Sequence, residues 1–330
     1  SSVTTGTSNV AVGVNALYSN TNSNNTAVGK DALKLNTATA NTAMGFAALE
    51  GNTTGTRNTA VGMQAMDNNT TGNYNVAVGS NQCLGANTTG SYNVAIGDGS
   101  LTAASGASFN VAVGQGALYS TTTGAYNTAV GYSVLSQNTT GGANVAMGAL
   151  AADAVTTGSY NTAVGENALT GNTTGQQNCA FGSNAGAQVI GSYNTFAGFY
   201  AGKDSDTGNY NTAFGYYAFC SNQNGTTDGE YNSAFGRNAL QVVSTGDYNT
   251  AVGDGAGIYI TSGDNNLMLG RGSGGNSSPS GQIQTHNDRI CLGNNSITNA
   301  YIKVDWTVTS DRRDKIEDGT VSHGLDFVNQ

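Results

Sequence analysis

Small and larger side chains alternate in a five-residue pattern that returns about every seventeen residues along this chain. The pattern is Asn-x-Ala-x-Gly, and its two variable positions hold mainly Thr, Val, Met and Phe. Alternation with a period of two is typical of a β-strand, because successive side chains point to opposite faces. Each copy therefore predicts a short strand with one small face and one larger face.

Sixteen copies of the pattern follow one another, and numbering each from its Asn gives a longer consensus. Ala-Leu stands at positions 8 and 9, Asn-Thr-Thr-Gly at 12 to 15, and Tyr at 17 in many copies. We expect Ala-Leu to form a second short strand, and Asn-Thr-Thr-Gly to form a turn whose Gly has positive φ. The copies begin at Asn9, Asn25, Asn41, Asn58, Asn75, Asn93, Asn110, Asn127, Asn144, Asn161, Asn178, Asn194, Asn211, Asn232, Asn249 and Asn266.

A unit of this length indicates one coil of a solenoid, since it is too short for a helical pair or for a propeller blade of about 40 residues. We predict an all-β fold, a parallel β-solenoid (β-roll) of about 16 seventeen-residue coils. At about 4.8 Å per coil, this makes a rod of roughly 75 Å. The Asn at position 1 is expected to stack coil upon coil, with its side-chain amides forming a ladder.

The two faces of the predicted strand differ in a way that indicates self-association. Position 3 is Ala in fourteen copies, with Phe196 and Met268 as the exceptions, and position 5 is Gly in all sixteen. We predict that this small face lies inside a thin coil, because larger residues would overpack it. The Val/Met/Phe face then points outward, and the same face of another chain is its simplest cover. This predicts a homotrimeric rod.

Composition narrows the classes of partner. The net charge is −9, and the 11 Lys and Arg form no dense patch, so no nucleic-acid partner is expected. The sequence contains no run of about 18 apolar residues, so no membrane insertion is predicted. The cysteines are far apart and form no metal-binding motif, so we expect four buried thiols made in a reducing compartment, with no metal and no cofactor. They are Cys83, Cys179, Cys220 and Cys291.

The repeat pattern ends near residue 270 and divides the chain into three expected parts. Residues 1–270 form the repeat shaft. Residues 271–309 contain a Gly/Ser-rich stretch and an alternating segment with the single Trp306. We expect an irregular neck or capping β region there, since a stacked rod needs closed ends. Residues 310–330 form the third part.

The Asn-x-Ala-[Val/Ile/Met/Phe]-Gly repeat, over about residues 9–270, resembles the β-roll heads of trimeric autotransporter adhesins and similar segments of phage tail fibres. This resemblance implies a left-handed coil and a trimer. Those heads use a shorter unit, and the Asn-Thr-Thr-Gly loop is an addition in this chain.

Residues 310–316 (Ser-Asp-Arg-Arg-Asp-Lys-Ile) and 324–329 (Gly-Leu-Asp-Phe-Val-Asn) resemble the start of an endosialidase-type intramolecular chaperone domain. Such domains end phage tailspikes and tail fibres, trimerise them and then cut themselves off. The resemblance implies cleavage at Thr309–Ser310, with Ser310 as nucleophile and Lys315 as base; burial lowers a lysine pKa enough for that role. The alternative is an ordinary helix start, since Ser followed by acidic residues is also a capping signal.

Together these features predict a structural, receptor-binding tail fibre of a bacteriophage, not an enzyme apart from a single-turnover self-cleavage. The expected partners are further copies of the chain, a host cell-surface glycan or protein receptor, and other tail proteins. The expected location is the virion tail, outside the cell, after assembly in the host cytoplasm. Two alternatives are a trimeric bacterial surface adhesin, which needs a stalk and a membrane anchor, and a polysaccharide-depolymerising tailspike, which needs two carboxylates roughly 5–9.5 Å apart.

Three sets of side chains are candidates for contacts or chemistry. Asp228 and Glu230 are the best carboxylate pair. Asn-x-Thr sequons at Asn52, Asn69, Asn87, Asn138 and Asn172 are explained more simply as turn residues than as glycosylation sites, and Thr alternates with Val too often for an ice-binding face. The possible glycan contacts, which could alternatively plug the rod, are Phe199, Tyr200, Tyr216, Tyr217 and Phe219.

Overall fold

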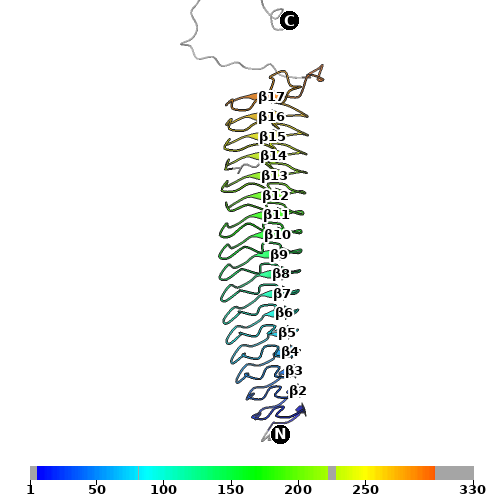
Figure 1. Cartoon of the computed structure of the whole chain (residues 1–330), viewed down its shortest axis with the longest axis vertical. Coiled ribbons are helices and arrows are strands. Elements are labelled where there is room, and N and C mark those ends of the chain that lie inside the picture. Colours follow the sequence, from blue (N-terminus) through cyan, green and yellow to red (C-terminus); the bar gives the residue numbers. More distant parts are fainter. Residues whose placement is uncertain (1–5, 81, 222–227, 302–330) are drawn as a thin grey trace, which may run out of the picture. The chain divides into compact units, whose positions relative to one another are not determined.

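The computed structural model describes residues 6–80, 82–221 and 228–301, and within them the chain is all-β with no helix. Seventeen strands of three residues each pair in parallel with the strand of the next coil, residue for residue and in register. This confirms the predicted parallel β-solenoid, whose stacked coils are seen in Figure 1. The strands are β1 (Val10–Val12), β2 (Thr26–Val28), β3 (Thr42–Met44), β4 (Thr59–Val61), β5 (Val76–Val78), β6 (Val94–Ile96), β7 (Val111–Val113), β8 (Thr128–Val130), β9 (Val145–Met147), β10 (Thr162–Val164), β11 (Cys179–Phe181), β12 (Thr195–Ala197), β13 (Thr212–Phe214), β14 (Ser233–Phe235), β15 (Thr250–Val252), β16 (Leu267–Leu269) and β17 (Ile290–Leu292). We number the coils after their strands.

The chain divides into two compact units, Ser1–Ser296 and Ile297–Gln330, and all seventeen strands lie in the first. The stack reaches one strand into the segment where an irregular neck was expected. β17 pairs in register with β16, but Arg289 stands where the other coils have Asn. The Asn pentad therefore could not reveal this coil.

The small face of each strand lies inside the coil, as predicted. The middle residue of the strand is buried in every coil from β2 to β17, whereas the residue at position 4 is exposed or half-buried. The buried interior consists of Ala at positions 3 and 8, Leu at position 9 and Asn at positions 1 and 12. Apolar burial and hydrogen-bonded amides therefore share one narrow core.

The expected second strand at Ala-Leu is wrong. Leu33 has a left-handed backbone (φ 48°), as does Asp31 two residues earlier (φ 59°). The Leu33 N–H donates to the Ala48 carbonyl of the following coil (3.0 Å), while the Asp31 N–H donates to the Val14 carbonyl of the preceding coil (2.9 Å). Left-handed residues at every second position thus direct their N–H groups to the neighbouring coils, and this segment is hydrogen-bonded along the stack without forming a strand. Each left-handed residue costs about 1–2 kcal/mol, which burial of the leucine and the bonds between coils offset.

The reason given for Gly in Asn-Thr-Thr-Gly is also wrong. Gly55 and its equivalents are not in the positive-φ region; that conformation falls on position 17, as at Tyr74 (φ 57°). A Cβ on Gly55 would lie 2.3 Å from the Gly72 carbonyl oxygen of the next coil and 2.6 Å from Oδ1 of Asn52. The glycine is required because neighbouring atoms leave no room for a side chain.

Position 5 requires glycine for both reasons. Gly131 has φ 136°, and a Cβ there would lie 2.9 Å from the carbonyl oxygen of Gly148 in the next coil. The constraint acts along the stack, between successive backbones, and not only across the thin coil as the sequence suggested.

The predicted asparagine ladder exists, and its bonds run mainly from side chain to backbone. Oδ1 of Asn127 accepts the backbone N–H of Asn144 in the next coil (3.0 Å), and Nδ2 of Asn127 donates to the Gly141 carbonyl (2.9 Å). The same two bonds recur through the described coils, and these side chains are buried. Each Asn at position 1 therefore bonds the backbones of two coils together.

A second asparagine column, at position 12, was not foreseen. Nδ2 of Asn36 donates to Oδ1 of Asn20 (2.9 Å), and the chain of amides continues through Asn52, Asn69 and Asn87 with contacts of 2.6–2.7 Å. The column is interrupted where the next coil has Ala104, Val155 or Val189, and below each interruption an Oδ1 is buried without a partner. Those oxygens belong to Asn87, Asn138 and Asn172.

The two large residues at position 3 are accommodated by glycines at position 9. Phe196 is fully buried where other coils have Ala, and a Cβ on Gly202 or Gly186 would lie 2.4 or 3.0 Å from its ring. Met268 has the same relation to Gly274, where a Cβ would lie 2.6 Å from the methionine sulfur. Volume added at one interior position is thus removed at the other.

Candidate interaction surface

An uncharged apolar strip runs along the whole stack on the outward side of the strands. We call the residues at positions 2 and 4 the strand face. No charged residue occurs at either position from β1 to β17. Its exposed large side chains include Val12, Met44, Ile96, Met147, Phe181, Phe214, Phe235 and Leu292. Position 4 is apolar in all seventeen strands, whereas position 2 is Thr or Ser in nine of them. An uncharged surface with a continuous apolar column of this length indicates contact with another molecule.

A row of aromatic rings borders the strand face at position 17, and we call it the tyrosine row. It contains two continuous stacks in which neighbouring rings are nearly parallel, with centroids 4.8–5.0 Å apart. The first stack is Tyr74, Tyr92, Phe109 and Tyr126, and the second is Tyr193, Tyr210, Tyr231 and Tyr248. The guanidinium of Arg57 lies 5.1 Å from the Tyr74 ring and covers the end of the first stack.

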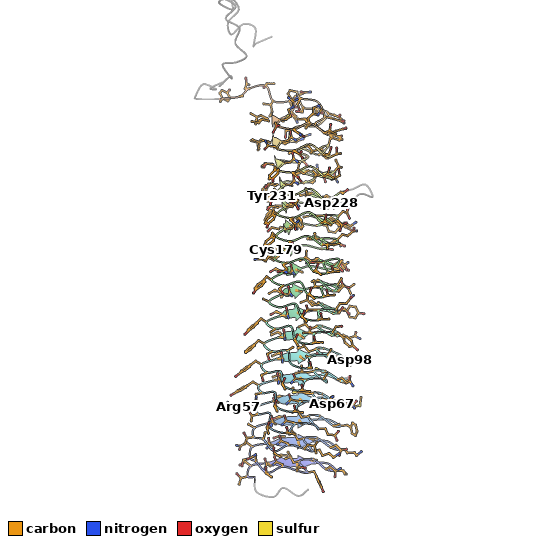
Figure 2. All side chains as sticks on the ribbon, turned by 90° about the vertical axis from the view of Figure 1, so that its left-hand side faces the viewer. Arg57, Asp67, Asp98, Cys179, Asp228 and Tyr231 are labelled. Atoms are coloured by element: carbon orange, nitrogen blue, oxygen red, sulfur yellow. The ribbon has the colours of Figure 1, made fainter. Side chains whose placement is uncertain are left out.

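Position 6 borders the opposite side of the strand face, and we call these residues the edge row. Figure 2 shows Arg57 of the tyrosine row and Asp98 of the edge row on opposite sides of the stack. The edge row mixes charges with exposed rings such as Tyr132. Its Arg237 donates from Nε to Asp254 Oδ1 (2.9 Å) and from Nη2 to Oδ2 (3.1 Å), which joins two coils at the surface. Exposed pairs of this kind contribute only about 0–1 kcal/mol.

Four of the five predicted glycan-contact residues form a surface cluster, and the fifth does not. Phe219 is buried in the core, so its prediction as a contact residue is wrong. The Phe199 and Tyr216 rings are stacked with centroids 5.6 Å apart, and those of Tyr200 and Tyr217 are 5.1 Å apart. Lys203 Nζ lies 4.8 Å from the Tyr200 ring. Stacking covers one face of each ring in these two pairs, and Phe199 and Tyr216 remain 41% and 52% exposed.

The predicted carboxylate pair is engaged in bonds between coils. Oδ1 of Asp228 accepts from the Thr207 hydroxyl (2.8 Å), and Oε1 of Glu230 accepts from Nδ2 of Asn209 (2.7 Å). Both partners belong to the preceding coil, so the two acids act as rungs of surface ladders. Within the described residues, no group of three or more His, Cys, Asp or Glu could hold a metal ion.

The sequon asparagines cannot carry a glycan in this fold. Asn52, Asn69, Asn87, Asn138 and Asn172 are fully buried and donate to a main-chain carbonyl of their own turn. This supports the interpretation of the sequons as turn residues.

The cysteines are free thiols, as predicted, but not all are buried. Cys83, Cys220 and Cys291 are buried, while Cys179 at position 2 of β11 is only half-buried. Burial, reinforced by the Asp204 carboxylate, raises the pKa of the Cys220 thiol to about 12. A thiol with so high a pKa is protonated at neutral pH and is a poor nucleophile.

An open hollow of about 310 Å³ near the carboxyl end of the first unit is lined by Ser280, Ile283, His286 and Arg289. Its polar side chains are exposed, so it holds no desolvated charge of the kind that an active site uses. The described part of the chain has no helix able to cross a membrane. Ser310 and Lys315, the predicted self-cleavage pair, lie outside the described residues.

Comparisons of this chain with family models, with curated proteins and with solved structures gave no match.

Proposed function

We propose that this chain is the shaft of a bacteriophage tail fibre, a homotrimeric rod that holds a receptor-contacting surface away from the virion. In this proposal three strand faces pack around a common axis. The parallel ladder from β1 to β17 supplies stiffness along the rod, and three identical chains multiply weak contacts with a host-surface glycan or protein.

The observation that carries the proposal is the uncharged strand face. It extends over seventeen coils, which at about 4.8 Å each is roughly 80 Å. With a width of about 10 Å for three extended residues, it presents roughly 800 Å² per chain, the area that each partner buries in a stable protein interface. Self-association would remove this surface from water and explain why no charge interrupts it.

Two other functions use the same fold. A trimeric bacterial adhesin would share the rod and the strand face. A polysaccharide-depolymerising tailspike would need a carboxylate constellation, and the best pair, Asp228 and Glu230, instead bonds to Thr207 and Asn209 of the neighbouring coil. The structural role is therefore favoured over the enzymatic one.

Immunogold labelling distinguishes the fibre from the adhesin. An antibody raised against residues 9–292 would be applied to bacteria that carry the gene and to lysates in which phage has been induced. We expect gold particles on phage tails. Labelling of the surface of uninduced cells, with no labelled virions, would contradict the fibre proposal and favour the adhesin.

The proposal includes maturation by self-cleavage at Thr309–Ser310, which follows from the resemblance of residues 310–330. Mass spectrometry of the full-length gene product should find a chain ending at Thr309. We expect Ser310→Ala to leave the product uncut because the nucleophile is missing, and Lys315→Ala to slow cutting strongly because the base is missing. Normal trimming of the Ser310→Ala product would remove Ser310 from this role.

A further inference from the structure

The described stack ends on an enlarged coil. Coil 16 runs over 23 residues, from Asn266 to Asp288, against seventeen in most coils, and the extra residues surround Pro279. β17 covers the strand of this coil, but within the described residues no backbone hydrogen bond joins residues 279–287 to any residue after Asp288. This half of coil 16 is therefore uncovered at the end of the described stack.

Two positions that the repeat constrains elsewhere hold basic side chains here. The His286 carbonyl accepts from Nδ2 of Asn266 (2.8 Å), the bond that Asn127 makes to Gly141, so His286 stands at the position of that glycine. Arg289 stands where the other coils have Asn. Without a covering coil, Gly and Asn are dispensable at these positions, because no further backbone crowds the Cβ or needs an acceptor. That freedom does not explain why the replacements are a histidine and an arginine.

His286 and Arg289 line the open hollow of about 310 Å³ together with Ser280 and Ile283. Ile283 is only 3% exposed, and it gives the hollow an apolar wall. Oγ of Ser280 accepts from Sγ of Cys291 (2.8 Å), which holds the serine hydroxyl in place. The volume is at the lower end of the range for small-molecule sites. The hollow therefore suits a single ring with one apolar face and several polar groups.

The guanidinium of Arg289 is not paired with a carboxylate of its own chain. Among the residues that the structure describes, it makes no ion pair. The acids at adjoining positions are engaged elsewhere: Oδ1 of Asp264 accepts the Asp247 N–H (2.9 Å), and Oδ1 of Asp288 accepts from Nδ2 of Asn265 (2.7 Å). In a chain with 20 Asp and Glu against 11 Lys and Arg, an unpaired arginine at a hollow favours an anionic ligand.

We propose that this hollow binds the carboxylated ring of a hexuronic acid residue, with Arg289 on the carboxylate. A guanidinium binds a carboxylate through two parallel hydrogen bonds, and its single charge balances that of the acid. A phosphate monoester carries close to two charges at neutral pH and would leave one unbalanced. Ser280 and His286 offer partners for the sugar hydroxyls, and Ile283 contacts the C–H face of the ring.

The inference rests on the proposed function only for the source of the sugar, an acidic polysaccharide of the host surface. A hollow of this size, open to water, binds a single sugar residue weakly. Three copies of the chain would place three such hollows at the same end of the rod, and a polysaccharide with many uronic acid residues could occupy them together.

The test uses the full 330-residue chain and three soluble probes that differ in one group: sodium glucuronate, glucose and glucose 6-sulfate. Binding is followed by saturation-transfer NMR during titration. We expect saturable binding of glucuronate, with glucose at least about tenfold weaker, because glucose lacks the charge-assisted contact. Glucose 6-sulfate, which has the charge without the planar carboxylate, should also bind more weakly than glucuronate.

Arg289→Asn assigns the site within the chain, because it installs the residue of the other coils. We expect it to abolish glucuronate binding and to leave the midpoint of urea denaturation unchanged. Arg271→Asn removes an exposed arginine of the same coil that does not line the hollow, and binding should persist. Should Arg289→Asn lower the midpoint, Arg289→Lys replaces it; this variant keeps the charge but lacks the planar fork, so glucuronate should bind several-fold more weakly.

Four outcomes would overturn the inference: no saturable binding of glucuronate, equal binding of glucose, tighter binding of glucose 6-sulfate, or an affinity for glucuronate that substitution of Arg289 does not change. None of them depends on the number of chains in the rod. The molar mass of the same sample tests the proposed trimer separately, so failure of the sugar site and failure of the rod are distinguishable.

Discussion

The two asparagine columns of the interior contain the same residue but differ in how often another residue replaces it. At position 1, Asn is unbroken from Asn25 to Asn266, whereas at position 12 it gives way to Ala104, Thr121 or Val155. The first column bonds to backbone: each side chain accepts an N–H of the next coil and donates to a carbonyl near the end of its own coil. In the second, each side chain donates to a carbonyl of its own turn, and its oxygen accepts from the amide of the next asparagine in the column and not from a backbone N–H. An Asn that accepts a buried backbone N–H is not replaced, because that N–H is present in every coil and would be left without an acceptor.

The same rule separates the other interior positions. Gly at position 5 meets the carbonyl of the next coil and recurs in every coil. Positions 3 and 9 meet each other's side chains, and they exchange volume in pairs, as at Phe196 and Gly202. Interior positions are therefore fixed by backbone contact and variable where side chains contact side chains.

The largest predicted effect compares the two columns within one coil. Asn127→Ala removes the two backbone bonds of a position-1 side chain, so the buried Asn144 N–H loses its partner, whereas the Gly141 carbonyl still accepts from Nδ2 of Asn138. We expect it to destabilise the protein by about 4 kcal/mol, from about 1–3 kcal/mol for the unsatisfied N–H together with the lost hydrogen bonds and packing of the side chain.

Asn138→Ala in the same coil is the matched control. Its Oδ1 already lacks a partner, so we expect a loss of about 1 kcal/mol, from the bond of Nδ2 to the Gly141 carbonyl and its longer bond to the Thr121 hydroxyl (3.4 Å). Urea denaturation of both variants measures the difference. Equal losses would contradict the distinction between the columns.

The second prediction concerns the volume exchange at coil 12. Gly202→Leu should destabilise the protein by about 3 kcal/mol, because the new Cβ would overlap the Phe196 ring. The backbone is not the obstacle, since Gly202 (φ 61°) has the left-handed conformation that Leu33 adopts. The double variant Phe196→Ala/Gly202→Leu, which rebuilds the usual coil, should recover most of that loss. The midpoints of urea denaturation of the single and double variants measure this recovery. A double variant no more stable than Gly202→Leu would mean that the two positions are not coupled.

A third prediction repairs an interruption of the second column. In Val155→Asn the new amide can donate to the unpaired Oδ1 of Asn138 and accept from Asn172 above. We expect stability to stay level or rise by about 1 kcal/mol, as a satisfied buried oxygen offsets lost apolar burial. Val243→Asn at the same position has Ile260 in the next coil, so we expect a loss of about 2 kcal/mol from an unpartnered amide. If both variants lost stability equally, partners within the column would not matter.

The smallest expected effect concerns the pH dependence of stability that comes from one half-buried carboxyl, that of Asp67. Burial raises the pKa of the Asp67 carboxyl, and the charge of Glu50 adds to the shift. The folded state therefore holds this proton more tightly than the unfolded state, and stability falls as pH rises above about 4. Asp67→Asn should melt at a slightly higher temperature than the wild type at pH 7, with the gap closing toward pH 4.

Asp254 provides the opposite sign for the same measurement. A hydrogen bond from Arg237 lowers the pKa of its carboxyl, so Asp254→Asn should cost a little stability at pH 7 and progressively less as the pH falls below about 4. A pH-independent difference between Asp67→Asn and the wild type would reject this role for the carboxyl.

The sequence was sufficient for the features that repeat with the pentad. Alternation predicted the strand, the inward side of Ala43 and the outward side of Met44, because a strand's faces follow directly from parity. The stacking of position-1 asparagines followed from the same in-register repeat. Ser310 and Lys315 stay predictions from resemblance, since they lie outside the described residues.

The features that the sequence did not reveal depend on contacts between coils. Leu33 has a left-handed backbone that no leucine prefers, so the second strand was a reasonable prediction that tertiary hydrogen bonding overrode. Phe219 stands at position 9, where most coils have the core leucine, so the aligned repeat carried a signal for its burial that its aromatic neighbours obscured.

The most direct test of the proposed rod is the molar mass of the purified chain in solution, by light scattering over a range of concentrations. Three copies of a 33.3 kDa chain should give about 100 kDa, constant down to low micromolar concentration, as expected for faces of roughly 800 Å² each. A stable, soluble species of 33 kDa under the same conditions would show that the strand face needs no partner and would contradict the account.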